Sequence, residues 1–147
     1  YSGGVLDNPT YEEVCQGNTG HAEVARIVFD EDIISYDNLL EAFWFVHDPT
    51  QLNRQGNDIG HHYRSVIFYH DENQKTKAID YLQKLEKEGV WDNKIVTEIS
   101  PLDNFYPAEK YHYDYLKRNP DNPYCVNIVR PKYEKFKSVF ETMLKEE

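Results

Sequence analysis

The order in which apolar runs alternate with helix-like segments constrains the fold of this chain more than any other feature. Residues 22–29 are predominantly apolar, and two shorter apolar runs follow at 65–69 and 95–99. Between these runs, apolar residues recur at helical spacing in 39–47 and 78–85. A helix between successive strands predicts an α+β fold, a two-layer α/β sandwich of the ferredoxin-like (split βαβ) type with a mixed sheet.

Residues that begin and end helices support these boundaries. Ser35 or Asp37 can cap the first helix, and Pro49 stops it. Residues 71–74 resemble a capping box at the start of the second helix, and Gly89 ends that helix. Both helices are therefore predicted with defined ends.

The length of the chain fits one domain, predicted over residues 1–147. Hydrophobic residues make up 39% of the sequence, which is enough for a single core. Residues 1–21 contain many glycines, asparagines and prolines, which indicates turns. Two further helices are predicted within a long, coil-rich C-terminal region: one opens at Pro107 and ends before Pro120, and the other covers residues 133–144.

Charge and composition exclude several classes of partner. A net charge of -10 disfavours nucleic acid, because binding phosphates requires a basic surface. No apolar run approaches the roughly 18 residues that span a bilayer, and no signal-peptide pattern appears in these residues, so we expect no membrane partner. Two cysteines do not make a disulfide framework, which favours a cytoplasmic location.

Two polar clusters lie directly before apolar runs. Residues 54–65 contain two glycines, an Asn-Asp pair, two histidines and a tyrosine, and residues 19–23 contain Thr, Gly, His and Glu. An ordinary turn before a strand is the simpler interpretation of either cluster. Two clusters of the same design nevertheless suggest a site built from loops at one edge of the sheet.

Four side chains of these segments suit acid–base chemistry. Glu23 lies beside apolar neighbours that favour its neutral form, so it can act as a general acid; a solvated carboxylate is the alternative. Tyr11 and Tyr63 carry phenols that can bind a polar oxygen, although tyrosines more often serve packing. Asp58 can orient one of these groups or stabilise its loop through an Asx turn.

A metal site is not expected. His21, His47, His61 and His62 lie near the polar clusters, but adjacent histidines of an extended segment point to opposite sides. No pair of cysteine ligands and no His-x-x-x-His spacing supports zinc. We therefore expect neither a metal nor another cofactor.

The two cysteines differ in their surroundings. Cys15 follows the acidic pair at 12–13, which disfavours a thiolate. Cys125 follows a segment rich in Pro and Asn, so we expect it on a mobile C-terminal segment where it can reach another sulfur. A free, buried thiol is the alternative for either cysteine.

Several segments together resemble the A-type methionine sulfoxide reductases (MsrA), the peptide-methionine (S)-S-oxide reductases. The resemblance extends from residue 1 to about residue 132. The matching segments are 11–15, 19–23, 47–50, 54–60, 63–65, 96–99 and 108–116. Each short motif alone is weak, but their order and spacing together are specific.

The resemblance implies reduction of methionine S-sulfoxide, free or in proteins, to methionine through a cysteine sulfenic acid. Glu23 would donate the proton, while Tyr11, Tyr63 and Asp58 would complete the polar side of the pocket. The further residues expected to bind substrate are Gly56, Asn57 and His47.

The family's nucleophile lies in a Gly-Cys-Phe-Trp-Gly motif that precedes the segment matching Tyr1. Residues 1–147 contain no match to it, so we expect the chain to lack the family's N-terminal strand, helix and attacking thiol. In many members a second cysteine resolves the sulfenic acid to a disulfide that thioredoxin reduces, and Cys125 is the candidate here. The alternative is a non-catalytic fragment or binding module that recognises methionine sulfoxide or a protein partner without turnover.

Overall fold

The computed structural model describes residues 1–144, and the chain divides into two compact units, Tyr1–Ala108 and Glu109–Glu147. The single domain over residues 1–147 stays a prediction. The combination of helices and small sheets confirms the α+β class.

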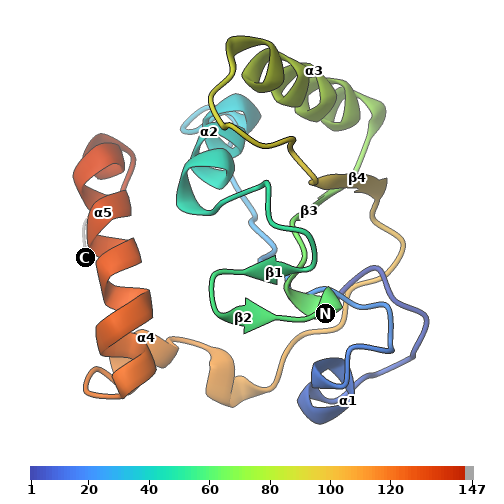
Figure 1. Cartoon of the computed structure of the whole chain (residues 1–147), viewed down its shortest axis with the longest axis vertical. Helices are drawn as coiled ribbons and strands as arrows, with labels where there is room; N and C mark the ends of the chain where they lie inside the picture. The colour runs from blue at the N-terminus through green and yellow to red at the C-terminus, as the bar shows by residue number, and fades with distance from the viewer. Residues whose placement is uncertain (145–147) are drawn as a thin grey trace. The chain divides into compact units, whose positions relative to one another are not determined.

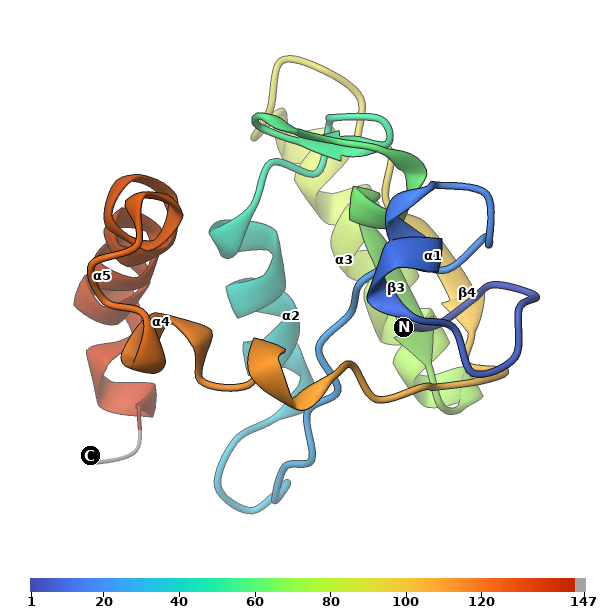
Figure 2. The same ribbon diagram turned by 90° about the horizontal axis from the view of Figure 1, so that it is seen from below.

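The core of the first unit is a β–α–β element covered by a second helix (Figures 1 and 2). Strand β3 (Val66–Tyr69) pairs in parallel with β4 (Glu98–Pro101), and α3 (Glu72–Glu88) connects them. Helix α2 (Tyr36–Val46) packs against α3. The buried residues of this apolar cluster are Leu40, Trp44, Ala78 and Ile95.

The ends of α2 and α3 follow the predicted signals. Ser35 caps α2, and its hydroxyl accepts a hydrogen bond from the backbone N–H of Asn38 at 3.1 Å. The Asp71 carboxylate accepts one from the backbone N–H of Gln74 at 2.8 Å and so caps α3. Gly89 ends α3 at a φ of 65°, a left-handed conformation that glycine adopts without a steric penalty.

Four short elements of the first unit were not predicted. Helix α1 (Tyr11–Cys15) lies in the segment predicted as turns, and Thr10 caps it through a capping box. The cluster at 54–65 forms a short antiparallel hairpin of β1 (Arg54–Gln55) and β2 (Asp58–Ile59), followed by the 3-10 helix η1 (His61–Tyr63).

The prediction of a buried strand over residues 22–29 is wrong. Ala22 alone pairs, through a bridge to Ser2, and the following residues are mostly exposed, with Val28 at 90%. An apolar run becomes a strand only when a neighbouring strand satisfies its backbone, and no other described strand pairs with this one. The described residues therefore form two small sheets instead of the predicted mixed sheet.

The strand predicted at 95–99 also begins later than expected. Its first part makes a different contact, because the backbone N–H of Val96 donates to the carbonyl of Pro49 at 2.8 Å. Only from Glu98 does the chain pair with β3.

The second unit is mainly helical, so the prediction of a coil-rich C-terminal region is wrong. The helix predicted between Pro107 and Pro120 begins only at Lys110 and is interrupted at Asp114, which has a left-handed φ of 52°. The predicted C-terminal helix is confirmed as α5. The elements are η2 (Lys110–His112), α4 (Tyr115–Arg118), the π-helical segment η3 (Cys125–Val129), α5 (Arg130–Phe140) and η4 (Glu141–Met143).

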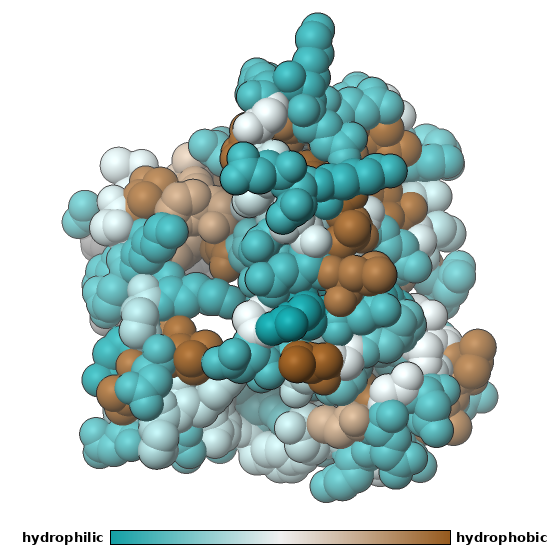
Figure 3. Space-filling view, viewed as in Figure 1, coloured by the Kyte–Doolittle hydropathy of each residue, from teal (hydrophilic) through white to brown (hydrophobic). Residues whose placement is uncertain are grey.

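Hydrophilic side chains cover much of the face shown in Figure 3, with hydrophobic residues interspersed among them. Among the described residues, none of the helices has the length and apolar character that crossing a bilayer requires.

Candidate active site

Three segments of the first unit bring the predicted acid–base residues together. Helix α1 supplies Tyr11, the extended segment after Ala22 supplies Glu23, and the β2–η1 region supplies Asp58 and Tyr63. Electrostatic interactions link Glu23 to Asp58 and to both tyrosines. Tyr11 and Glu23 thus interact with side chains 35 to 52 positions later in the sequence, and we call this group of four polar side chains the polar pocket.

Backbone hydrogen bonds on both sides fix the position of Glu23. Ala22 exchanges two hydrogen bonds with Ser2, at 2.8 and 3.1 Å. The backbone N–H of Glu23 then donates to the carbonyl of His62 at 2.9 Å. Glu23 is therefore held against η1 by its main chain, while its side chain keeps its own freedom.

The loop that leads to Glu23 is organised around the buried imidazole of His21. Nδ1 of His21 accepts a hydrogen bond from the backbone N–H of Gly4 at 3.0 Å. Nε2 therefore carries the proton in the neutral ring and donates to the carbonyl of Leu6 at 2.7 Å. Both nitrogens of His21 therefore make hydrogen bonds within the loop.

The environment of Glu23 favours its protonated form. Although the residue is solvent-accessible, the surrounding protein desolvates its carboxyl group and raises its pKa. The negative charge of Asp58 raises that pKa further. The direction of this shift agrees with the acid role expected from the sequence.

Both tyrosines remain protonated phenols in this pocket. A side-chain hydrogen bond with Cys15 is the largest cause of the raised pKa of Tyr11. Desolvation is the largest cause for Tyr63, followed by the charges of Glu23 and Asp58. Each phenol thus keeps an O–H that can donate to an oxygen of a ligand.

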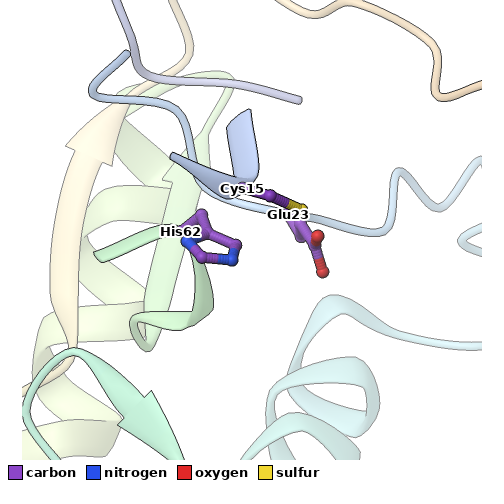
Figure 4. Close-up of side chains that lie close together, drawn as sticks. All are labelled: Cys15, Glu23 and His62. Atoms are coloured by element: carbon purple, nitrogen blue, oxygen red, sulfur yellow. The ribbon is translucent and has the colours of Figure 1, made fainter. Parts of the chain in front are cut away.

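Cys15 and His62 also belong to this pocket, although neither was predicted as a site residue. Figure 4 shows Cys15 and Glu23 side by side, with the ring of His62 facing them. Ligand atoms of these three side chains lie within 4.8 Å of one another. His62 is 4% exposed, its ring packs on that of Tyr63 with centroids 4.0 Å apart, and burial lowers its pKa.

The sequence carried a signal for Cys15. Thr10 and Glu13 have the spacing of a capping box, which indicates the start of a helix. Residues at positions i and i+4 of a helix share one face. Cys15 therefore lies beside Tyr11. The sequence held no comparable signal for His62. The expectation that His61 and His62 point to opposite sides assumes an extended segment, whereas both residues lie in the 3-10 helix η1.

The three predicted substrate-binding residues lie in two different settings. Nδ1–H of His47 donates to the carbonyl of Phe43 at 2.7 Å, so Nε2 accepts from the Ser65 hydroxyl at 2.7 Å. Gly56 and Asn57 form the exposed tip of the β1–β2 hairpin. Their role toward substrate stays a prediction.

Cys125 lies in the second unit. It is free, fully buried and placed at the start of η3, which matches a buried thiol better than the expected mobile segment.

Comparison with known families identifies the class of protein. The sequence matches the family described as peptide methionine sulfoxide reductase over residues 1–144. The chain belongs to the MsrA-type peptide methionine sulfoxide reductases. It is thus an oxidoreductase of redox repair, in a family whose reaction is the reduction of methionine sulfoxide.

Individual relatives agree with this assignment. The chain is 57% identical to the peptide methionine sulfoxide reductase MsrA of Nautilia profundicola over 136 residues, which cover 92% of this chain and 77% of the relative. It is 50% identical to the MsrA of Saccharolobus solfataricus over 145 residues, 99% of this chain and 81% of the relative.

Solved structures show the same fold. The reduced form of Mxr1 from Saccharomyces cerevisiae superposes with a TM-score of 0.79 at 35% identity, covering 85% of this chain and 71% of that one. Methionine sulfoxide reductase A of Corynebacterium diphtheriae gives a TM-score of 0.70 at 39% identity, covering 81% and 61%.

Proposed function

We propose that this MsrA-type protein reduces methionine S-sulfoxide, free or within oxidised proteins, with Glu23 as the proton donor. One observation supports this proposal most directly. A carboxyl group with a raised pKa shares its pocket with the protonated phenols of Tyr11 and Tyr63.

The chemistry of a sulfoxide suits this arrangement. Its oxygen carries partial negative charge, and that charge grows as the bond to sulfur weakens. The O–H groups of Tyr11 and Tyr63 would hold this oxygen, and protonated Glu23 would transfer its proton there. Desolvation of the carboxyl group and, after it, the negative charge of Asp58 raise the pKa of Glu23, which would favour its acid form.

The proposed reaction also requires a thiol. A thiolate attacks the sulfoxide sulfur, and the oxygen passes to the cysteine, which leaves methionine and a sulfenic acid. In the family that the sequence resembles, this thiol belongs to the Gly-Cys-Phe-Trp-Gly motif, which has no match among residues 1–147. The side chains named above would bind and protonate the oxygen in this step.

Cys125 is the proposed resolving cysteine, with thioredoxin as the reductant. Its thiol would condense with the sulfenic acid, releasing water and forming a disulfide. Because Cys125 is fully buried, η3 must open before this step. With Cys125→Ser, we expect one equivalent of methionine per enzyme but no turnover with thioredoxin; undiminished turnover would exclude the role.

The resemblance supports two further proposals. In a two-layer ferredoxin-like arrangement, β3, α3 and β4 would form one βαβ element. A cytoplasmic location would agree with the two free cysteines.

The stereochemistry of the substrate tests the proposed function. The natural protein that carries these residues is incubated with either epimer of methionine sulfoxide and dithiothreitol, and methionine release is followed. We expect steady release from the S epimer and none above background from the R epimer. Binding of the S epimer without release would contradict the proposal and favour the binding-module alternative.

A further inference from the structure

We propose that Cys15, Glu23 and His62 form a binding site for a thiophilic divalent cation, with Zn²⁺ as the representative ion. The site combines a thiol from α1, a carboxylate from the extended segment and an imidazole from η1. It lies in the pocket that contains the two tyrosines, yet the sequence predicted no metal there.

The distances are close to those that one ion needs. One ligand atom from each of the three side chains lies within 4.8 Å of the other two. Zinc bonds to sulfur at about 2.3 Å and to nitrogen or oxygen at about 2.0–2.2 Å, so tetrahedral ligand atoms are roughly 3.5 Å apart. Movements of about 1 Å at Cys15 and at the exposed Glu23 side chain would complete the geometry.

The imidazole of His62 is the buried member of the cluster. The residue is 4% exposed, and its Nδ1 is buried without a hydrogen-bond partner among the described residues. Nδ1 lies on the side of the ring that packs beside Gly60. The other nitrogen, Nε2, is the one that faces Cys15 and Glu23 in Figure 4, so we assign it as the ligand atom.

The backbone already positions two of the three ligands. The hydrogen bond from the Glu23 N–H to the His62 carbonyl, 2.9 Å long, ties the two residues together. The Cys15 side chain lies beside Glu23 in Figure 4 and also hydrogen-bonds with Tyr11. Little rearrangement of the main chain is therefore needed for binding.

The donor set selects the class of ion. Sulfur and imidazole nitrogen favour Zn²⁺ and similar soft ions, whereas Mg²⁺ and Ca²⁺ prefer oxygen ligands only. Three protein ligands leave a fourth position for water, as in open zinc sites. Binding releases the thiol proton of Cys15 to the solvent and involves no change of oxidation state.

A cation at this site would occupy the carboxylate of Glu23. If Glu23 is the proton donor of the proposed function, Zn²⁺ would inhibit the reductase reversibly. The binding itself does not depend on that function.

Direct titration tests the site. The 147-residue chain, reduced with a phosphine and freed of metal, is titrated with Zn²⁺ in competition with a chromophoric chelator. We expect one ion per chain. Substituting Co²⁺ should give a thiolate charge-transfer band and the visible absorption of a four-coordinate ion.

Matched variants identify the ligands. Because loss of an outer-shell partner alone weakens a metal site about 10–100-fold, Cys15→Ser and His62→Gln should each weaken Zn²⁺ binding at least tenfold. Cys125→Ser and His61→Gln remove the same ligand types outside the cluster and should leave the affinity unchanged. Circular dichroism checks the fold of each variant. Should His62→Gln fail to fold, loss of the thiolate Co²⁺ band in Cys15→Ser is the deciding measurement.

The outcomes separate the cation site from the reductase function. Unchanged affinity in Cys15→Ser, or an equal loss in Cys125→Ser, would overturn the site without affecting the proposed function. Tight binding at Cys15 with no inhibition of methionine release would confirm the site and argue against Glu23 as the proton donor.

Discussion

The polar pocket and the apolar cluster of the first unit are built in opposite ways. The cluster of Leu40, Trp44, Ala78 and Ile95 is at most 5% exposed and lies mainly on two regular helices. The pocket comes from a five-residue helix, an extended segment and a two-residue strand, and Glu23 is exposed. Apolar burial thus stabilises the cluster, whereas individual polar contacts hold the pocket together. Substitutions in the cluster should therefore change mainly stability, and substitutions in the pocket mainly activity.

Truncation of the apolar cluster should have the largest effect on stability. Leu40→Ala leaves a cavity in a fully packed region and should lower the free energy of unfolding by about 2–5 kcal/mol, measured in denaturant. Leu52→Ala, at a residue that is 68% exposed, is the control and should cost far less. A tenfold loss of kcat/KM in folded Leu40→Ala protein would show that the two regions are not independent.

Removal of a phenol hydroxyl from the pocket should lower activity and leave stability almost unchanged. Tyr11→Phe and Tyr63→Phe each delete one donor to the sulfoxide oxygen and should lower kcat/KM about 10²-fold, or roughly 2.7 kcal/mol. Thermal unfolding should change little, and Tyr113→Phe in the second unit should match the wild type. Full activity in both pocket variants would assign these tyrosines to packing.

Gly4→Ala should affect both properties, since it acts on the loop that carries Glu23. A Cβ at Gly4 would lie 2.4 Å from the backbone nitrogen of His21 and 2.5 Å from the carbonyl oxygen of Thr19. Backbone atoms must then move, so we expect a loss of about 1–3 kcal/mol in stability together with reduced methionine release.

Gly17→Ala is the control for this loop, because no atom lies within 4 Å of its added Cβ. Its φ of 76° makes any cost conformational, and activity should persist. Normal activity of Gly4→Ala would show that the loop does not position Glu23.

The smallest expected effect is on stability in acid. The Thr50 hydroxyl at 2.6 Å and the Thr50 N–H at 2.9 Å donate to the Asp48 carboxylate and lower its pKa. A folded pKa below the unfolded value, about 3.9, adds stability above that value and loses it as pH falls through the lowered pKa.

Asp48→Asn should therefore be less stable than wild type at neutral pH, by about 1 kcal/mol or less, and the gap should close below about pH 4. Urea unfolding at several pH values measures this gap. A gap that does not depend on pH would assign the effect to packing, and methionine release at neutral pH should not change.

The sequence predicted the regions that local signals determine. Ser35 and Gly89 mark helix ends through their own backbone chemistry, and the spacing of apolar residues reveals the buried faces of α2 and α3. The segment at 22–29 was predicted wrongly because a strand depends on a distant partner, which an apolar run does not encode.

The candidate site was also predicted only in part. The grouping of Tyr11, Glu23, Asp58 and Tyr63 was expected from the family motifs. Their electrostatic interactions in the structure agree with that grouping, while their catalytic roles stay proposals. Cys15 was missed with its helix, although Thr10 and Glu13 carried the capping signal. The ring of His62 lies in the pocket because the chain turns into η1 after Gly60, and the sequence pattern did not indicate this turn.

Methionine release by Glu23→Gln tests most directly whether the polar pocket performs the chemistry. The amide keeps the size of the side chain but supplies no acidic proton. The natural protein carrying this substitution should release methionine from the S-sulfoxide about 10²–10⁴-fold more slowly, with its unfolding unchanged. Glu12→Gln, at an exposed position of α1, should match the wild type. A rate for Glu23→Gln close to that of the wild type would contradict the proposed role and leave Glu23 as a structural residue.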